Sequence, residues 1–224
     1  MESSTTLIAS AYERLRADVL SGHWTPGQKL GIETLREYYE TGATPVREAL
    51  NRLAAEGWVQ HLDQRGFAVA PVSEEALREL ALTRVWVETM ALRKSMQRKD
   101  ETWEESVVLA LHRLSKMPRS LSTEHYDENP AWEKLHRGFH MALVGHCGSR
   151  WLVSFCEQLY DQAYRYRQLA VKRAYKLRDE LAEHRAIVDA IVAADADSAC
   201  AALEAHYTRT THIILESGPH ANGN

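Results

Sequence analysis

The sequence predicts a mainly α-helical chain made of two segments with different texture. In residues 1–73, short amphipathic stretches alternate with turn signals, and the segment closes on two short runs of strand-forming residues. From residue 74 onward the apolar residues recur at helical spacing, without a strand pattern or a glycine-rich loop. Short connections such as CGSR and AADAD favour antiparallel neighbours, so the second segment is expected to be an all-α antiparallel helical bundle.

The first segment begins with two helices joined by a turn. The first helix is indicated by apolar residues at offsets of zero, four, seven and eleven, namely Ile8, Tyr12, Leu15 and Val19. Gly22 closes this helix, since glycine readily adopts the left-handed conformation that ends helices. Pro-Gly in the stretch HWTPGQKL marks a turn, and a short helix is expected around Glu33 to Tyr39.

A third helix is expected to begin at Thr44 and Pro45, with the threonine as N-cap and the proline at the first helical position. Its inward face carries Val46, Ala49, Leu50 and Leu53, and its outer face carries Arg47, Glu48, Asn51 and Arg52. The stretch WVQHL-DQRG-FAVAP predicts two strands around a turn at 63–66, with Phe67 and Val69 alternating against Ala68 and Ala70. This order of elements is that of a winged helix-turn-helix, which presents one helix to the major groove of DNA while its hairpin tip reaches the adjacent backbone or minor groove.

The charge of the chain supports DNA binding only locally. The net charge is −4, and residues 1–73 contain seven Lys or Arg against nine Asp or Glu. Positive charge is concentrated on Arg47, Arg52 and Arg65. Attraction to phosphate is therefore expected to be weak and salt-sensitive, with specificity resting on a few side chains.

The composition is that of an ordinary soluble globular protein, with 45% apolar and 26% charged residues. No apolar run approaches the ~18–20 residues that span a bilayer, and the N-terminal residues show no secretory signal. The three cysteines are odd in number and form no CxxC pair, which indicates a reducing, cytoplasmic setting. Membrane and secreted classes are therefore not expected.

The second segment is expected to contain six helices, at roughly 75–97, 102–117, 130–147, 149–172, 177–194 and 196–217. Three of them carry apolar stripes that include histidines. The stripes are Trp132, Leu135, Phe139 and Leu143 with His136 and His140; Leu177, Leu181, Val188 and Ile191 with His184; and Ala199, Leu203 and Ile213 with His206. Four histidines therefore point inward from three helices.

Four inward histidines favour a metal site, although a single one is usually a satisfied core residue. Four buried imidazoles without partners cost on the order of several kcal/mol, and a shared divalent ion would satisfy them together. Imidazole suits Zn, Ni, Fe or Cu. Structural histidines in an ion-free core remain the alternative. The histidines without such convergence are His112, His125, His146, His212 and His220.

The histidine pair does not predict catalysis. HRGFH superficially resembles the HExxH pincer of metalloproteases, but Arg137 stands where the general base Glu is needed. No nucleophile elbow, phosphate loop or paired-carboxylate motif is found elsewhere, so the chain is not expected to be an enzyme.

Inward arginines indicate where an organic acid can bind. Arg84 and Glu88 lie on the inward face of the helix at 75–97. Arg84 can clamp a small carboxylate bidentately, or it can form a buried ion pair with Glu88 one turn away. Arg165 and Arg167 are further pocket candidates, of which at least one is expected on a solvated face.

These stretches carry a family resemblance. AYERLRADVLSGHWTPGQKL, TPVREALNRLAAEGWV and RGFAVAPVS resemble the DNA-binding domain of GntR-type bacterial transcription regulators. TRVWVE, HRGFHMAL and EHRAIVDAI, with the last helix bearing His206, resemble the FCD-type effector-binding domain of the FadR subgroup. The match covers nearly the whole chain. It implies a homodimer on a pseudo-palindromic operator, and a helical C-terminal domain that holds a metal and a small carboxylate.

Residues 1–73 are thus expected to bind DNA, residues 74–218 to bind effector and dimerise, and residues 219–224 to form a disordered tail. The DNA-contacting set is Thr44, Pro45, Arg47, Asn51, Arg52, Arg65 and Gly66; the metal set is His136, His140, His184 and His206; and the effector set is Arg84, Glu88 and Arg165. The chain departs from the family at two points. Gly42-Ala43 replaces the usual Ser-Arg, and His136 replaces a frequent Asp, which leaves an all-nitrogen site with one negative charge fewer.

The function that follows is a metabolite-responsive transcription regulator, most simply a repressor, whose operator affinity changes when a small organic acid binds near a divalent metal such as Zn or Ni. A regulator for which the ion itself is the signal is the alternative. A metal-dependent enzyme fused to a DNA-binding module is disfavoured by the missing base.

Overall fold

The computed structural model describes the backbone of residues 4–62, 66–98, 100–174 and 178–217, and the chain divides into two compact units, Met1–Ser73 and Glu74–Asn224. The wing-tip residues 63–65, including Arg65, lie outside the described residues, as do Leu177 and the tail at 219–224. Within the described part, no helix is both long and apolar enough to cross a bilayer.

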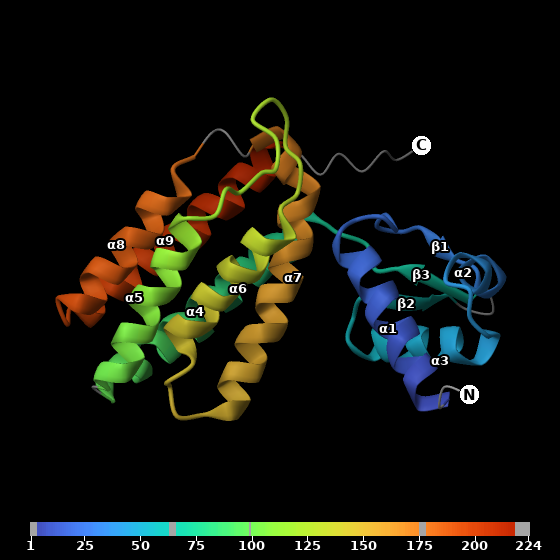
Figure 1. Ribbon diagram of the computed structural model, residues 1–224, viewed down its shortest axis with the longest axis horizontal. Helices are drawn as coiled ribbons and strands as arrows, with labels where there is room; N and C mark the ends of the chain where they lie inside the picture. Colours follow the sequence, from blue (N-terminus) through green and yellow to red (C-terminus); the bar gives the residue numbers. More distant parts are fainter. Residues whose placement is uncertain (1–3, 63–65, 99, 175–177, 218–224) are drawn as a thin grey trace. The chain divides into compact units, whose positions relative to one another are not determined.

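The first unit contains helices and a small sheet (Figure 1). Its elements are α1 (Ser4–Leu20), β1 (Lys29–Leu30), α2 (Ile32–Tyr38), α3 (Ala43–Ala55), β2 (Val59–Leu62) and β3 (Gly66–Val69). The strands are antiparallel in the order β1-β3-β2. The winged helix-turn-helix expected from the sequence is confirmed, with one strand more than the hairpin predicted.

The additional strand corrects the reading of the wing. The two-residue β1 is too short to show a period of two, and it pairs with Phe67 and Ala68 of β3. Just before β1, Val69 N–H donates to Gln28 O at 2.9 Å, and Val69 O accepts from Gly27 N at 3.0 Å. Because β3 becomes the central strand, Phe67, Ala68 and Val69 are all buried. The expected alternation of Phe67 and Val69 against Ala68 was therefore wrong.

The start of α3 also differs from the expectation. The helix begins at Ala43, and the N-cap is Gly42, whose carbonyl accepts from Val46 N at 3.3 Å. Thr44 is thus inside the helix, not its N-cap, and Pro45 occupies the third helical position. Proline fits there because the N–H groups of the first helical turn have no intrahelical partner in any case.

The packing of α1 on α3 supports the exposed face of α3. Arg52 lies over the ring of Tyr12, 3.7 Å from the ring centroid, and its Nε is 3.2 Å from Glu56 Oε1. Tyr12 donates to the same carboxylate at 2.7 Å. Arg47, by contrast, is exposed and makes no hydrogen bond or ion pair within the described part of its unit.

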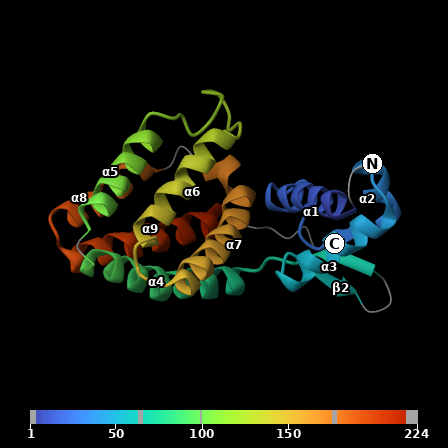
Figure 2. The same cartoon turned by 60° about the horizontal axis from the view of Figure 1, so that its bottom comes forward.

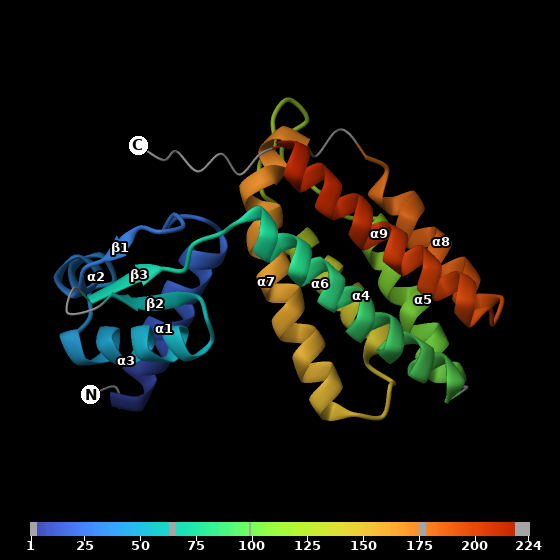
Figure 3. The same cartoon turned by 180° about the vertical axis from the view of Figure 1, so that it is seen from behind.

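The second unit is the helical bundle that the sequence predicts. Its helices are α4 (Glu74–Gln97), α5 (Glu101–Ser115), α6 (Pro130–Val144), α7 (Arg150–Ala174), α8 (Glu180–Val192) and α9 (Ala196–Ser217). Seen from behind, α4 lies between α7 and α9, which both pack on it (Figure 3). On the other side α5 packs on α6 and α8 (Figure 2). Asp100, Asn129 and Asp179 cap the starts of α5, α6 and α8.

The apolar stripes of α6, α8 and α9 face the core largely as expected. Phe139, Leu143, Val188 and Leu203 are all at most 4% exposed. One assignment in α9 was off by a residue, because Ile214 is buried and Ile213 only partly so. Over fifteen residues, a small drift of the helix from its ideal period moves the buried position by one.

Candidate metal centre

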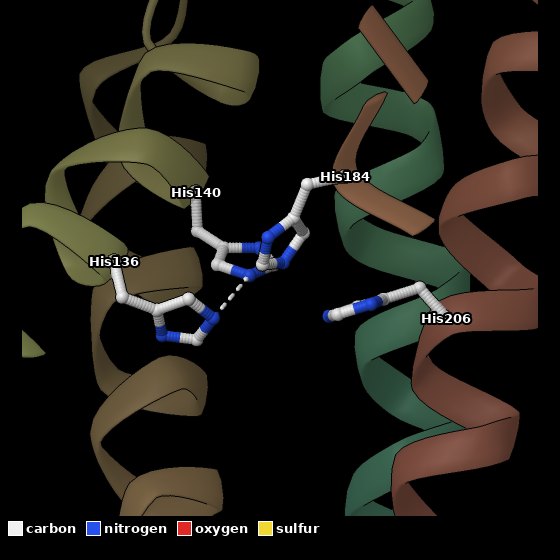
Figure 4. A group of neighbouring side chains, drawn as sticks. All are labelled: His136, His140, His184 and His206. Carbon is white, nitrogen blue, oxygen red and sulfur yellow. Dashed lines mark hydrogen bonds between the residues drawn. The ribbon is translucent and has the colours of Figure 1, made fainter. Parts of the chain in front are cut away.

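Four histidines from three helices meet in the core of the bundle. His136 and His140 lie one turn apart on α6, while His184 comes from α8 and His206 from α9 (Figure 4). Each is at most 4% exposed, and one nitrogen from each ring lies within 4.8 Å of the others. The Nε2 atoms of His136 and His140 are 3.2 Å apart. The sequence stripes thus bring all four expected histidines together.

The outer nitrogens of three rings are held from behind, two through a tyrosine that is bound to an acid and one by an acid directly. His136 Nδ1 lies 2.8 Å from the Tyr160 hydroxyl, which donates to Glu133 at 2.7 Å. His140 Nδ1 lies 3.2 Å from the hydroxyl of Tyr207, which donates to Glu88. Acids that hold the outer ring nitrogen fix the tautomer and orient the inner nitrogen of a metal ligand.

His206 is oriented by a carboxylate directly. Its Nδ1 lies 3.0 Å from Glu183 Oε2 and 2.9 Å from Arg178 Nη2, and these two contacts require opposite protonation of the same nitrogen. A ring that directs the Nε2 lone pair at an ion carries its proton on Nδ1, which selects the bond to Glu183. Arg178 then pairs with Glu183 through its Nε, at 2.8 Å.

His184 supplies the test of whether an ion fits. Neither of its ring nitrogens has a hydrogen-bond partner among the described residues, although the side chain is fully buried. A buried polar group in this state costs about 1–3 kcal/mol. Three oriented rings and one unsatisfied ring are the donor set that a divalent ion such as Zn²⁺ or Ni²⁺ satisfies. The residues present therefore fit a metal.

Burial keeps the four rings in the ligating form. It lowers the pKa values of His136, His140 and His206 well below the usual range, and the neighbouring rings and arginines lower them further. For His184, burial lowers the pKa to about 4, although Glu180 opposes the shift. Neutral imidazoles are the form that binds metal ions.

The metal-free protein is therefore expected to lose stability as the pH falls below about 6.5, the usual pKa of a histidine side chain. Between about pH 4.5 and 6.5 the unfolded chain binds protons that the folded rings refuse, so the free energy of unfolding falls as pH falls, by about 1.4 kcal/mol per pH unit for each such ring. Urea unfolding of chelator-treated protein across this range measures the slope. In a His184→Gln variant the slope should be smaller by the contribution of one ring, about 1.4 kcal/mol per pH unit. An unchanged slope would contradict a neutral, buried His184 in the folded protein.

A pocket of about 340 Å³ borders the histidines. Of the four histidines, His184 lines it, next to Trp132. The charged side chains of the lining are Arg119, Arg178, Asp179 and Glu180. Arg119 Nη1 lies 3.0 Å from Glu180 Oε2. Burial raises the pKa of Glu180, but Arg119 and, after it, His184 and Arg178 outweigh burial and lower it. The pocket can therefore accept an organic anion beside the rings.

None of the three residues expected to bind the effector lines this pocket. Arg84 and Glu88 form the buried pair that the sequence left open, with Nε and Oε1 2.6 Å apart, and they act behind Tyr207. Arg165 is 3% exposed but lies about 140° around α7 from Tyr160, at 100° per residue. The expectation that Arg165 or Arg167 is solvated was wrong, because Arg167 is held by Glu133 at 2.8 Å.

Several residues of the site were not expected from the sequence. These are Glu88 as an acceptor for Tyr207, together with Glu133, Tyr160, Glu183, Tyr207, Glu180, Arg119 and Arg178. Glu180 did carry a signal, since it stands four residues before His184 and so shares its helix face. Arg119 lies between α5 and α6, where no periodicity indicates its direction.

Comparison with known protein families gives matches to both units. The model for bacterial regulatory proteins of the gntR family matches residues 7–69, and the model for the FCD domain matches residues 79–209. The chain is 37% identical to the HTH-type transcriptional regulator BphR of Paraburkholderia xenovorans, over 95% of this chain and 87% of BphR. It is 31% identical to the HTH-type transcriptional repressor GlaR of Escherichia coli, over 92% of this chain and 94% of GlaR.

A solved structure shows the same fold. The Escherichia coli protein McbR/YncC aligns with a TM-score of 0.72 at 21% identity, covering 96% of this chain and 99% of that one.

Proposed function

Because this chain belongs to the GntR family of bacterial regulators, with an FCD C-terminal domain, we propose that it is a metabolite-responsive repressor. Its relatives make it a DNA-binding transcription regulator and not an enzyme. In this proposal a small organic acid binds beside a divalent metal in the second unit and changes the affinity of the first unit for its operator. Repression is inferred from GlaR, a repressor by name that matches over most of both chains.

The observation that carries the proposal is the buried cluster of four histidines beside a pocket that two arginines help to line. His136, His140, His184 and His206 would hold the ion, which supplies a coordination position for a carboxylate. Arg119 and Arg178 line the same pocket and provide the charge that an acid needs. The effector role expected for Arg84, Glu88 and Arg165 is thus reassigned, with Arg84 and Glu88 as supports of His140 through Tyr207.

The DNA-binding role is assigned to the exposed side of α3. Thr44, Arg47 and Asn51 are exposed there, with Pro45 partly so, while Gly66 is exposed at the start of β3. Ala43 is the first helical residue and has no donor for a base, so base reading falls to Arg47 and Asn51. Arg52 is already engaged by Tyr12 and Glu56, so its proposed contact is to phosphate.

A homodimer is proposed from exposed apolar residues on α4. Leu82, Trp86 and Met90 follow each other at four-residue spacing and are 49%, 61% and 57% exposed. Three large side chains on one helical face form a patch that association with a second copy would cover. A two-fold dimer places two recognition helices on two half-sites of one operator.

Trp86→Glu is expected to give a monomer that binds operator more than about tenfold more weakly, because the second half-site contact is lost. Sedimentation gives the mass, and fluorescence anisotropy gives the affinity. Val192→Glu, which charges an apolar side chain 54% exposed on α8, should stay dimeric. A dimeric Trp86→Glu protein would refute this interface.

The proposal as a whole is tested with operator DNA obtained by selection from genomic fragments. Metal-loaded protein must bind such a fragment, and a small carboxylate must change the dissociation constant. If no carboxylate does so, the effector part of the proposal is wrong.

A further inference from the structure

Glu180 belongs both to the histidine cluster and to the pocket. It is the first residue of α8, one turn before His184, and is 7% exposed. Its Oε1 lies 3.8 Å from His136 Nε2, and its Oε2 lies 3.0 Å from Arg119 Nη1. The geometry at Oε2 is not that of a hydrogen bond, so this buried oxygen has no hydrogen-bond partner among the described residues. The carboxylate is therefore buried, ionic and incompletely satisfied.

The position of Glu180 Oε1 meets the distance requirement of a metal ligand. Atoms bound to one ion at ~2.0–2.2 Å lie roughly 3–4 Å from each other. The Nε2 atoms of His136 and His140 are 3.2 Å apart, and the four ring nitrogens span at most 4.8 Å. A separation of 3.8 Å between Glu180 Oε1 and His136 Nε2 falls within this range.

Charge also favours the Glu180 carboxylate as a ligand of the metal ion. Four neutral imidazoles leave the charge of a divalent ion uncompensated, since none of them is anionic. The acids behind the other rings act at a distance, Glu133 and Glu88 through tyrosines and Glu183 through the outer nitrogen of His206. Glu180, by contrast, lies beside the inner nitrogen of His136, which is the nitrogen turned toward His140.

We propose that Glu180 is an internal carboxylate ligand of the ion, which it shares with the four histidines, and that an anion entering from the pocket must displace it. The inference rests on the metal of the proposed function. Glu180 supplies, from α8, the negative charge that the four histidines lack. Because Glu180 and His184 both line the pocket, an incoming carboxylate competes with Glu180 for the same coordination position and for Arg119.

The test uses Co²⁺, whose visible spectrum reports its coordination, with the full-length protein. Glu180→Gln keeps the shape of the side chain and removes the charge. We expect Glu180→Gln to bind Co²⁺ about 10–100-fold more weakly than the wild type and to show a changed visible spectrum. Acetate should alter the spectrum of Co²⁺-loaded Glu180→Gln at a lower concentration than it alters that of the wild type.

Two further variants separate ligation from general effects. Asp179→Asn removes a charge from the adjacent, exposed residue and keeps an N-cap side chain, so its Co²⁺ affinity should match the wild type. Asp189→Asn likewise removes a charge from an exposed residue of α8, so its Co²⁺ affinity should also match the wild type. Thermal unfolding confirms that each variant is folded.

Wild-type affinity and spectrum in Glu180→Gln would overturn the inference, and so would equal weakening in Asp179→Asn or Asp189→Asn. In those cases the metal of the proposed function stands. If the wild type itself takes up no Co²⁺, the metal is wrong and the inference falls with it.

Discussion

Replacing His184 with alanine is expected to lower the affinity for the divalent ion by about 100-fold or more, while leaving the metal-free protein nearly as stable as before. The ring is one of the four histidines proposed as ligands, yet neither of its nitrogens has a hydrogen-bond partner in the described structure. Removing a large buried side chain costs about 2–5 kcal/mol, and relief of two buried unsatisfied nitrogens, at about 1–3 kcal/mol each, offsets that cost. Most substitutions of a buried residue destabilise a protein, so this combination is specific to a ligand.

The measurement is metal content of the purified protein together with thermal unfolding in the loaded and chelated states. Loading should stabilise the wild type by about 2.7 kcal/mol at a free metal concentration of 100 times Kd, and His184→Ala should lose that gain. His212→Ala serves as the control, because that histidine is also on the helical bundle but its side chain is 70% exposed. Equal metal content in His184→Ala and wild type would contradict the site.

Arg47→Ala is expected to weaken binding to the selected operator by about 1–3 kcal/mol, or roughly 5- to 150-fold. Arg47 is exposed on α3 and unpaired within the described part of its unit, so its guanidinium is available for a bidentate contact with guanine. A base contact also makes the loss depend on sequence. Binding to the operator should fall, while weak binding to unrelated DNA changes little.

The salt dependence of the same variant separates base reading from phosphate contact. Loss of one phosphate contact lowers the slope of log affinity against log salt by about one, whereas loss of a base contact leaves the slope unchanged. Arg78→Ala, which removes an arginine whose side chain is 64% exposed on α4, should bind operator like the wild type. Arg47→Ala binding as tightly as Arg78→Ala would place sequence reading elsewhere.

Helical spacing explains why the histidine cluster was predictable from the sequence. His136 and His140 are four residues apart inside an apolar stripe, and this spacing puts both rings on the buried face whatever the neighbours are. His184 and His206 each lie in a stripe of their own. Because the buried faces of bundled helices meet in one core, the four rings were expected to converge there.

The residues that hold the histidine rings were less predictable, because periodicity shows which face of a helix a residue lies on but not which side chain it contacts. The i, i+4 spacing of Arg84 and Glu88 is equally compatible with an ion pair and with a clamp for a ligand. The structure shows the ion pair, and Tyr207 from α9 also donates to Glu88. Tyr160 and Arg167 share one face of α7 by their seven-residue spacing, but only packing reveals that Glu133 joins them.

Short elements were the other source of error. β1 contains two residues and depends on backbone bonds to β3, which lies far along the chain. Arg119 projects from a segment without regular structure, so its place in the pocket wall is set by the surrounding helices. Long-range contacts of this kind leave no local pattern in a sequence.

Coupling between the metal-bound pocket and the operator is measured through operator affinity in four states: metal-loaded or chelated, each with and without a series of small carboxylates. We expect one or more acids to weaken operator binding of the loaded wild type by about 5- to 150-fold. The same acids should have no effect on chelated protein or on His184→Ala.

By linkage, operator DNA must weaken binding of the acid by the same factor, which calorimetry checks. An operator affinity that changes with metal loading alone, and with no acid, would contradict coupling to an organic acid and make the ion itself the signal.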